Sequence, residues 1–78
     1  MTSSSEQKYN VPGLDRALTI IELLNEKPAG FSVNEISAEL KFPVNSVYRI
    51  MSTLERRNYV VKRNGESGYV LSEKLLGL

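Results

Sequence analysis

The fold is decided by residues 31–57, which read FSVNEISAELKFPVNSVYRIMSTLERR. Ser32 and Glu35 have the spacing of a capping box, which predicts a short helix that ends near Leu40. Residues 41–43, Lys-Phe-Pro, are too few for anything but a tight turn, and a proline suits the start of another helix. Two helices joined by about three residues form a helix-turn-helix arrangement.

Both helices of this pair carry an apolar side. In the first helix, the expected inner residues are Val33, Ile36 and Leu40. The second helix is expected over about residues 44–57, and its buried stripe, with the spacing i, i+3, i+4, i+7, consists of Val47, Ile50, Met51 and Leu54. At about 100° per residue the polar residues gather opposite this stripe. They are Asn45, Arg49, Ser52 and Arg56, with Tyr48 on one flank and Ser46 and Thr53 on the other.

A further helix is expected ahead of the pair, opened by residues 11–13 (Val-Pro-Gly) and ended by Pro28 and Gly30. Its predicted core side consists of Leu14, Ala17, Leu18, Ile21 and Leu24, and widens to Ile20. Leu23 falls on the otherwise polar side of this helix. We expect it to be exposed there, as a candidate contact between subunits.

After Asn58 the pattern changes from helix to strand. Residues 59–63 are β-branched and aromatic, residues 64–68 (NGESG) supply turn chemistry, and residues 69–71 are expected to pair back. Such a hairpin needs an apolar side packed on the helices, formed either by Tyr59 and Val61 or by Val60. The sequence leaves the register open. Phe31 is expected to add a short strand or to pack as a staple.

Together these elements predict a mainly α fold with a small β wing, the winged helix-turn-helix, over residues 11–72. It has three helices plus a two-stranded hairpin. Residues 1–10 are Ser-rich and polar, which predicts a flexible tail. Residues 73–78 begin another helical pattern rich in Leu, and we expect them to start a linker helix toward a domain beyond this chain.

Composition disfavours several classes of function. The chain has neither Cys nor His, so it lacks thiolate ligands, the commonest metal ligand and the commonest general base. We therefore expect no enzyme, no metal and no cofactor. No apolar run approaches the roughly 20 residues that span a bilayer, and the first residues lack the order of a signal peptide. A soluble, cytoplasmic protein without membrane contact is expected.

The net charge of +1 conceals an asymmetry along the chain. Residues 14–40 contain five acidic and two basic side chains, whereas residues 41–63 contain six basic side chains against the single acid Glu55. The basic half includes the second helix of the pair and the first strand of the hairpin. A basic half in a nearly neutral domain indicates a polyanionic partner.

An α-helix fits the major groove of duplex DNA, and the polar side of the second helix of the pair matches base edges. Arg49 is expected to bond guanine twice or to hold a phosphate, and Asn45 to bond adenine. Ser46 or Thr53 suits phosphate oxygens, and Tyr48 suits a thymine methyl or a phosphate. The first two turns of this side contain no Asp or Glu, an absence that repulsion by phosphate explains.

The wing has two candidate DNA contacts at the end of its first strand. Lys62 and Arg63 are expected to reach the flanking backbone or the minor groove. Glu66, in the same turn, disfavours deep insertion. A charged hairpin tip also serves solubility, so both roles remain open.

Several ordered segments resemble the N-terminal domain of IclR-type bacterial transcription regulators. They are VPGLDRALTIIELL (residues 11–24), FSVNEI (31–36), FPVNSVYRI (42–50), YV (59–60) and YVLS (69–72). The resemblance covers residues 11–78. It implies a winged helix joined by a linker helix to a larger C-terminal domain that binds a small organic effector. It also implies homodimers or homotetramers that bind a palindromic operator in duplex DNA.

The resemblance further implies DNA-facing roles for Pro43, Asn45, Ser46, Tyr48 and Arg49. The chain departs from the usual pattern in two places. Residues 44–46 are Val-Asn-Ser, where a Ser or Lys followed by a Ser-Thr pair is usual, and Glu66 lies in a turn that is often basic. These departures affect the operator sequence and the role of the wing. The alternative function is a winged helix that acts as a protein-protein interaction module without DNA, indicated by Leu23, Leu75, Leu76 and Leu78.

Overall fold

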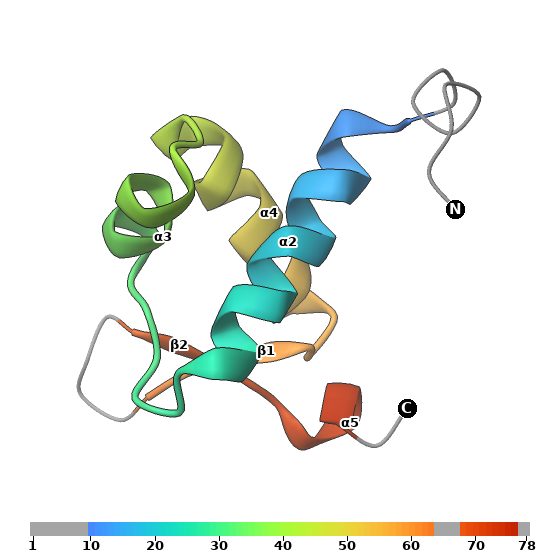
Figure 1. The fold of residues 1–78 in the computed structure, drawn as a ribbon. Helices are drawn as coiled ribbons and strands as arrows, with labels where there is room; N and C mark the ends of the chain where they lie inside the picture. Colours follow the sequence, from blue (N-terminus) through green and yellow to red (C-terminus); the bar gives the residue numbers. More distant parts are fainter. Residues whose placement is uncertain (1–9, 64–67, 77–78) are drawn as a thin grey trace, which may run out of the picture.

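The computed structural model of the chain describes residues 10–63 and 68–76. Its elements are α2 (Pro12–Glu26), α3 (Val33–Leu40), α4 (Val44–Arg56), β1 (Val60–Lys62), β2 (Tyr69–Leu71) and α5 (Glu73–Leu76). In Figure 1 the three longer helices pack together, and the hairpin of β1 and β2 lies below them. The expected winged helix-turn-helix is confirmed. The predicted flexible tail, except for Asn10, lies outside the described residues.

The predicted capping box opens α3. Ser32 Oγ accepts a hydrogen bond from the Glu35 backbone N–H at 3.1 Å, and Glu35 Oε1 accepts one from the Ser32 N–H at 2.9 Å. The helix ends because Lys41 adopts the left-handed conformation, with φ of 58°. The expected inner residues are buried or packed against the core: Ile36, Val33 and Leu40.

A side chain also holds the turn between α3 and α4. Ser37 Oγ donates to the Phe42 carbonyl at 2.6 Å, and the Phe42 N–H donates to the Ser37 carbonyl at 3.2 Å. Pro43 is the N-cap of α4, and the Val47 N–H makes the first helical bond to its carbonyl at 3.1 Å. The predicted stripe of α4 is confirmed, with Ile50 half-buried and the others buried: Val47, Met51 and Leu54.

The orientation of α2 differs from the expected one. Leu14 and Leu18 are 58% and 50% exposed, whereas Ile20 is completely buried and Leu24 nearly so. The prediction that Leu14 and Leu18 face the core is therefore wrong. The physical reason is that α2 packs on both α4 and β2, so two neighbours decide which side is buried. The prediction that Leu23 is exposed is also wrong, because its side chain is half-buried and packs against the core.

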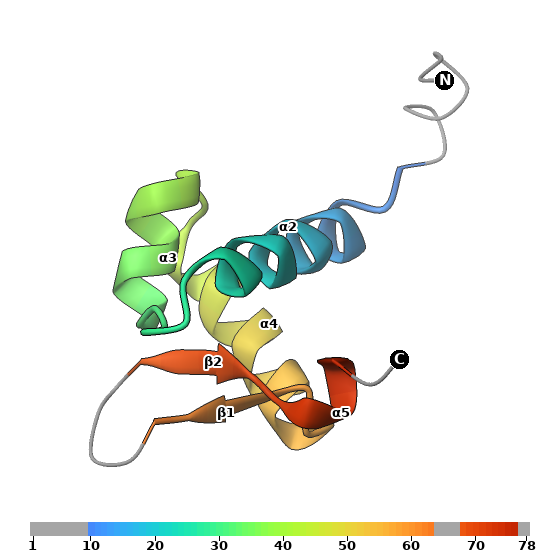
Figure 2. The same ribbon diagram turned by 60° about the horizontal axis from the view of Figure 1, so that its bottom comes forward.

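The hairpin is antiparallel, as Figure 2 shows from another side. Its register pairs Val60 with Leu71, Val61 with Val70 and Lys62 with Tyr69. Val60 is completely buried, whereas Val61 is 44% exposed. Of the two packing sides that the sequence left open, the structure has the one formed by Val60.

Phe31 extends this sheet by one bridge. The N–H of Phe31 donates to the Tyr69 carbonyl at 3.1 Å, and the N–H of Tyr69 donates to the Phe31 carbonyl at 2.7 Å. The strand-like alternative for Phe31 is thus confirmed. Gly30 brings the chain into this bridge with φ of 93°, and a Cβ atom there would lie 2.8 Å from the Tyr69 carbonyl oxygen. A residue without a side chain is therefore required.

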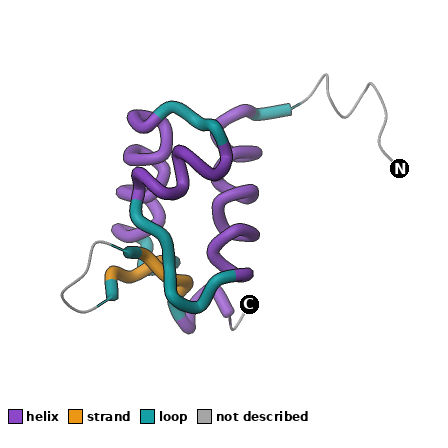
Figure 3. The backbone as a smooth tube through the Cα atoms, turned by 60° about the vertical axis from the view of Figure 1, so that its left-hand side comes forward, coloured by secondary structure: helices purple, strands orange, loops and turns teal. Residues whose placement is uncertain are grey.

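The core joins all these elements except α5. It consists of Ile20, Leu24, Phe31, Ile36, Val47, Met51, Leu54, Val60 and Tyr69. Figure 3 shows the strands below the three longer helices, so the buried side of the hairpin closes this helical layer from one end. No helix in residues 10–63 and 68–76 is long and apolar enough to cross a bilayer.

The helix expected after the wing is present as α5, and it is fastened to the end of α4. Lys74 Nζ donates to the Arg57 carbonyl at 3.1 Å, and Ser72 Oγ donates to the Asn58 carbonyl at 2.5 Å. The Lys74 ammonium also lies 5.0 Å from the centre of the Tyr59 ring. These contacts satisfy carbonyl groups that the end of a helix leaves without partners.

Candidate nucleic-acid interface

The candidate interface is the outer side of α4, and its first turn is electrostatically suited to an anion. Pro43, the N-cap, supplies no side-chain hydrogen bond, and the first turn contains no acidic residue. Among residues 10–63 and 68–76, no side chain caps the N–H groups of this turn, and these groups lie at the positive end of the helix dipole. A phosphate oxygen is the kind of group that such a helix end binds.

The predicted site residues on α4 divide into an outer side and two edges. On the outer side, Asn45 and Arg49 are exposed. Tyr48, 62% exposed, lies on one edge. Ser46, half-buried, and Thr53, exposed, lie on the edge that faces α2. The structure therefore brings the predicted residues of α4 onto one continuous surface of this helix.

An apolar groove separates Thr53 from α2. It has a volume of about 270 Å³ and is lined by Gly13, Ala17, Arg49, Ile50, Thr53 and Leu54. The Thr53 hydroxyl donates to the Arg49 carbonyl at 3.1 Å, so its hydrogen is already used. A phosphate oxygen can only accept, so a bond from Thr53 to phosphate requires this hydroxyl to rotate away from the helix.

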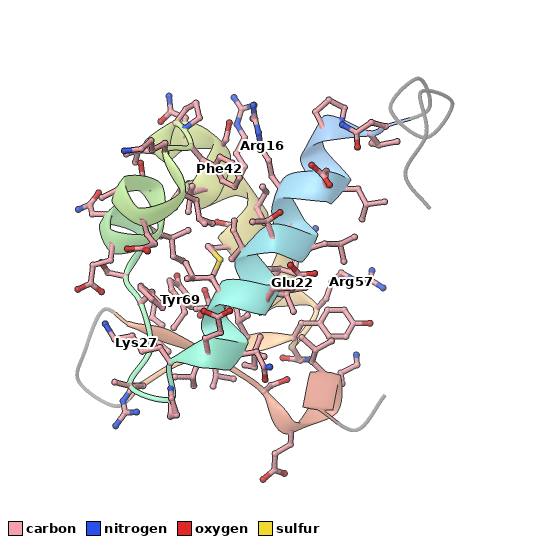
Figure 4. All side chains as sticks on the ribbon, viewed as in Figure 1. Arg16, Glu22, Lys27, Phe42, Arg57 and Tyr69 are labelled. Carbon is pink, nitrogen blue, oxygen red and sulfur yellow. The ribbon has the colours of Figure 1, made fainter. Side chains whose placement is uncertain are left out.

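A residue absent from the sequence prediction, Arg16 of α2, lies at the first turn of α4. Its Nη1 donates to Ser46 Oγ at 3.2 Å, and its guanidinium carbon lies 5.5 Å from the centre of the Phe42 ring. Figure 4 shows Arg16 and Phe42 side by side at the top of the molecule. The sequence holds only an indirect signal for Arg16: no acidic residue lies three or four positions away on its own helix, which leaves its charge unpaired there but does not place it beside α4.

The two predicted contacts of the wing are exposed, and each has a partner within the domain. Lys62 Nζ lies 5.7 Å from the centre of the Tyr69 ring. Arg63 Nη1 donates to the Pro28 carbonyl at 3.0 Å, which ties the wing to the connection after α2. A guanidinium has five N–H donors, so this bond leaves others for a phosphate. The turn that contains Glu66 lies outside the described residues.

Glu55, the one acid of α4, is turned toward the wing. The Tyr69 hydroxyl donates to Glu55 Oε1 at 3.3 Å, and Glu55 is half-buried. Burial raises the pKa of the Tyr69 phenol above its ordinary value, and the nearby Glu55 charge is the second cause of this increase. The carboxylate is thus held away from the outer side of α4, where it would repel a phosphate.

The described residues contain no cluster of side chains suited to a metal ion, and their other groove has none suited to catalysis. No group of three or more Asp or Glu side chains suited to a metal ion occurs among residues 10–63 and 68–76. A second, more polar groove of about 340 Å³ lies beside β2 and the end of α2. It is lined by Leu24, Asn25, Lys27, Pro28, Arg63, Val70 and Leu71, a set without a nucleophile and base pair.

Comparison with known proteins agrees with this geometry. Residues 13–64, about two thirds of the chain, match the sequence profile of the IclR helix-turn-helix domain. No curated protein matches the chain. The matched segment spans α2, the helix-turn-helix of α3 and α4, and β1, which are the elements that build the candidate interface. The chain therefore belongs to the IclR helix-turn-helix domain family and is a DNA-binding domain of a transcription regulator.

Proposed function

We propose that this domain recognises a specific duplex DNA sequence by placing α4, its recognition helix, in the major groove. The observation that carries the proposal is the outer side of α4, which exposes Asn45 and Arg49 and holds its only acid, Glu55, toward the wing. Asn45 pairs with adenine, and Arg49 pairs with guanine or a phosphate. Pro43, directly before the first turn of α4, and Tyr48, in its second turn, are both exposed and also contact the DNA.

The wing holds the flanking backbone. Lys62 and Arg63 are exposed cations near its tip, and both keep N–H donors for phosphate while contacting Tyr69 and Pro28. Such contacts set the position of α4 on the duplex without distinguishing one base from another. On this basis α4 supplies sequence preference and the wing supplies affinity.

In the intact regulator, two such domains bind a palindromic operator as part of a homodimer or homotetramer. Two recognition helices of a dimer then lie about 34 Å apart, which is one turn of DNA. The family resemblance supports a linker helix, begun by α5, and a following domain that binds a small organic effector. A cytoplasmic location agrees with this role, since the operator is in the cytoplasm of a bacterial cell.

The salt dependence of binding tests the proposed function. Fluorescence anisotropy of the 78-residue chain with labelled duplexes from a randomised pool should give affinity that falls steeply as salt rises, because bound phosphates release counterions. Sequencing the recovered duplexes should show a shared motif of a few base pairs. A flat salt response, or no enrichment over the starting pool, would contradict the proposal.

A second candidate function is an interaction surface for another protein, without DNA. Leu23, which suggested it, is half-buried, but Leu14 and Leu18 are exposed on α2 and supply an apolar surface in its place. Replacing both with Ser should leave DNA affinity unchanged if DNA is bound by α4 and the wing as proposed. Retained partner binding by an Arg49→Ala variant that has lost DNA affinity would favour this second function.

A further inference from the structure

We propose that Arg16 controls which hydrogen-bonding group Ser46 offers to DNA. The Arg16 guanidinium holds the Ser46 oxygen as an acceptor, and the hydroxyl hydrogen is left to donate to an acceptor atom of the duplex. The inference rests on the proposed DNA-binding function. It adds to that function a positioning residue that lies on α2, outside the helix-turn-helix.

Two contacts fix Arg16 against the start of the recognition helix. Its Nη1 lies 3.2 Å from Ser46 Oγ, and the Phe42 ring lies beneath the guanidinium, 5.5 Å from its carbon. Both partners are uncharged, so neither neutralises the positive charge. Ile20, one turn further along α2, is completely buried, so the backbone that carries Arg16 is anchored in the core. These two contacts hold the side chain against Ser46.

The chemistry of a guanidinium decides the direction of this bond. Arginine has only donors, so the Ser46 oxygen must accept. A helical hydroxyl often donates to the carbonyl four residues before it, as Thr19 does to Asp15 at 3.0 Å and Thr53 does to Arg49 at 3.1 Å.

For Ser46, the carbonyl four residues before it belongs to Phe42, and this carbonyl accepts from Ser37 at 2.6 Å. Within residues 10–63 and 68–76, the Ser46 hydroxyl accepts from Arg16 and donates to no group. Its hydrogen is therefore available at the surface of α4.

The hydroxyls of Ser46 and Thr53, both on the edge of α4 that faces α2, thus differ in their hydrogen-bonding roles. Thr53 has used its hydrogen and offers lone pairs, whereas Ser46 offers its hydrogen. The acceptors that suit Ser46 are phosphate oxygens and the base atoms purine N7, guanine O6 and thymine O4. Without Arg16, the Ser46 hydroxyl turns freely and both donates and accepts, so its preference for an acceptor falls.

A double-mutant cycle tests the inference with the full chain and a duplex that the wild-type chain recovers from a randomised pool. Ser46→Ala should weaken binding about 3- to 10-fold in the wild-type background. In an Arg16→Met background, which keeps an aliphatic stem over Phe42, the same change should weaken binding less than about 2-fold. Arg57→Met is the matched control, because Arg57 also lies over an aromatic ring, 5.9 Å from the centre of Tyr59. It lies 11 residues after Ser46, at the far end of α4, about 16 Å away along the helix axis.

The outcomes separate this role from the others. An effect of Ser46→Ala that is the same in all three backgrounds would overturn the inference and make Arg16 an independent phosphate contact. In that case Arg16→Met should reduce the slope of log affinity against log salt concentration by about the value for one phosphate. No effect of Ser46→Ala in the wild type would also overturn it. If the wild type itself binds no duplex, the proposed function fails, and this inference fails with it.

Two further measurements complete the test. A scrambled duplex distinguishes the acceptors, because a phosphate contact of Ser46 costs affinity on every sequence and a base contact only on the recovered one. Thermal melting followed by circular dichroism checks that the variants fold. If Arg16→Met does not fold, Arg16→Gln, whose neutral side chain is too short to reach Ser46, takes its place in the cycle with the same expected loss of coupling.

Discussion

The Tyr69 hydroxyl donates a hydrogen bond to the Glu55 carboxylate at 3.3 Å and so joins the second strand of the wing to the recognition helix. The two residues are 14 positions apart, and Tyr69 also bridges Phe31 through its backbone. One tyrosine therefore connects the wing, the recognition helix and the segment before α3. This residue is therefore one of the contacts that hold the wing on α4, beside the buried Val60.

Tyr69→Phe should lower the free energy of unfolding by about 0.5–1.5 kcal/mol at neutral pH, because the hydrogen bond to Glu55 is lost while the ring remains buried. Urea denaturation followed by circular dichroism measures this change. Tyr48→Phe is the control, since Tyr48 is 62% exposed and its replacement should cost little. An equal loss in both variants would contradict the role assigned to the Tyr69–Glu55 bond.

The raised pKa of Tyr69 predicts how this stability depends on pH. Burial and Glu55 raise the pKa of the folded phenol above that of the unfolded chain, so the folded state keeps the proton longer. The stabilisation is complete below the unfolded pKa of about 10 and is lost as pH rises through the folded value. The difference in unfolding free energy between wild type and Tyr69→Phe should therefore stay constant up to about pH 10 and shrink as pH rises further. A difference that grows with pH would show the opposite sign.

Gly30→Ala should destabilise the fold by about 1–3 kcal/mol. The residue has φ of 93°, and a Cβ atom would lie 2.8 Å from the Tyr69 carbonyl oxygen within the Phe31 bridge. Gly13→Ala is a matched control because Gly13 is helical and nothing lies within 4 Å of the place that an alanine methyl group would occupy. That change should be neutral or stabilise by up to about 1 kcal/mol. Thermal melting of both variants tests the contrast, and similar melting temperatures would contradict it.

The packing side of the hairpin gives a third pair of variants. Val60→Ala should cost about 2 kcal/mol, since Val60 is completely buried. Val61→Ala should cost less than about 1 kcal/mol because its side chain is 44% exposed. Urea denaturation of the two variants decides between the two sides of the hairpin that the sequence left open. A larger loss for Val61→Ala would mean that the register is shifted by one residue.

The elements that could be predicted from the sequence are those set by neighbours along the chain. The capping box of Ser32 and Glu35 and the stripe of α4 depend on residues three or four positions apart, and the structure has both. The side of α2 that is buried could not be predicted, because β2 and α4 set it from distant positions. Leu14 and Leu18 are apolar at helical spacing, yet neither neighbour covers them.

The same limit applies to the candidate site. The polar side of α4 follows from its spacing, so exposed Asn45 and Arg49 could be predicted. Arg16 could not, because it reaches Ser46 across 30 positions of the sequence. The hydrogen-bond polarity of Ser46 and Thr53 also requires coordinates, since it depends on which carbonyl each hydroxyl faces.

Arg49→Ala gives the most direct test of the recognition helix. Arg49 is exposed, so its removal should leave the melting temperature within a few degrees of wild type. If Arg49 bonds a guanine, affinity for the recovered duplex should fall by about 1–3 kcal/mol, and the preference at one base pair should relax. If it holds a phosphate, affinity should fall on all sequences and the salt dependence should decrease by about one phosphate. Arg57→Ala removes the same charge at the far end of α4 and should do neither. Equal losses for the two variants would mean that total charge, and not the outer side of α4, determines binding.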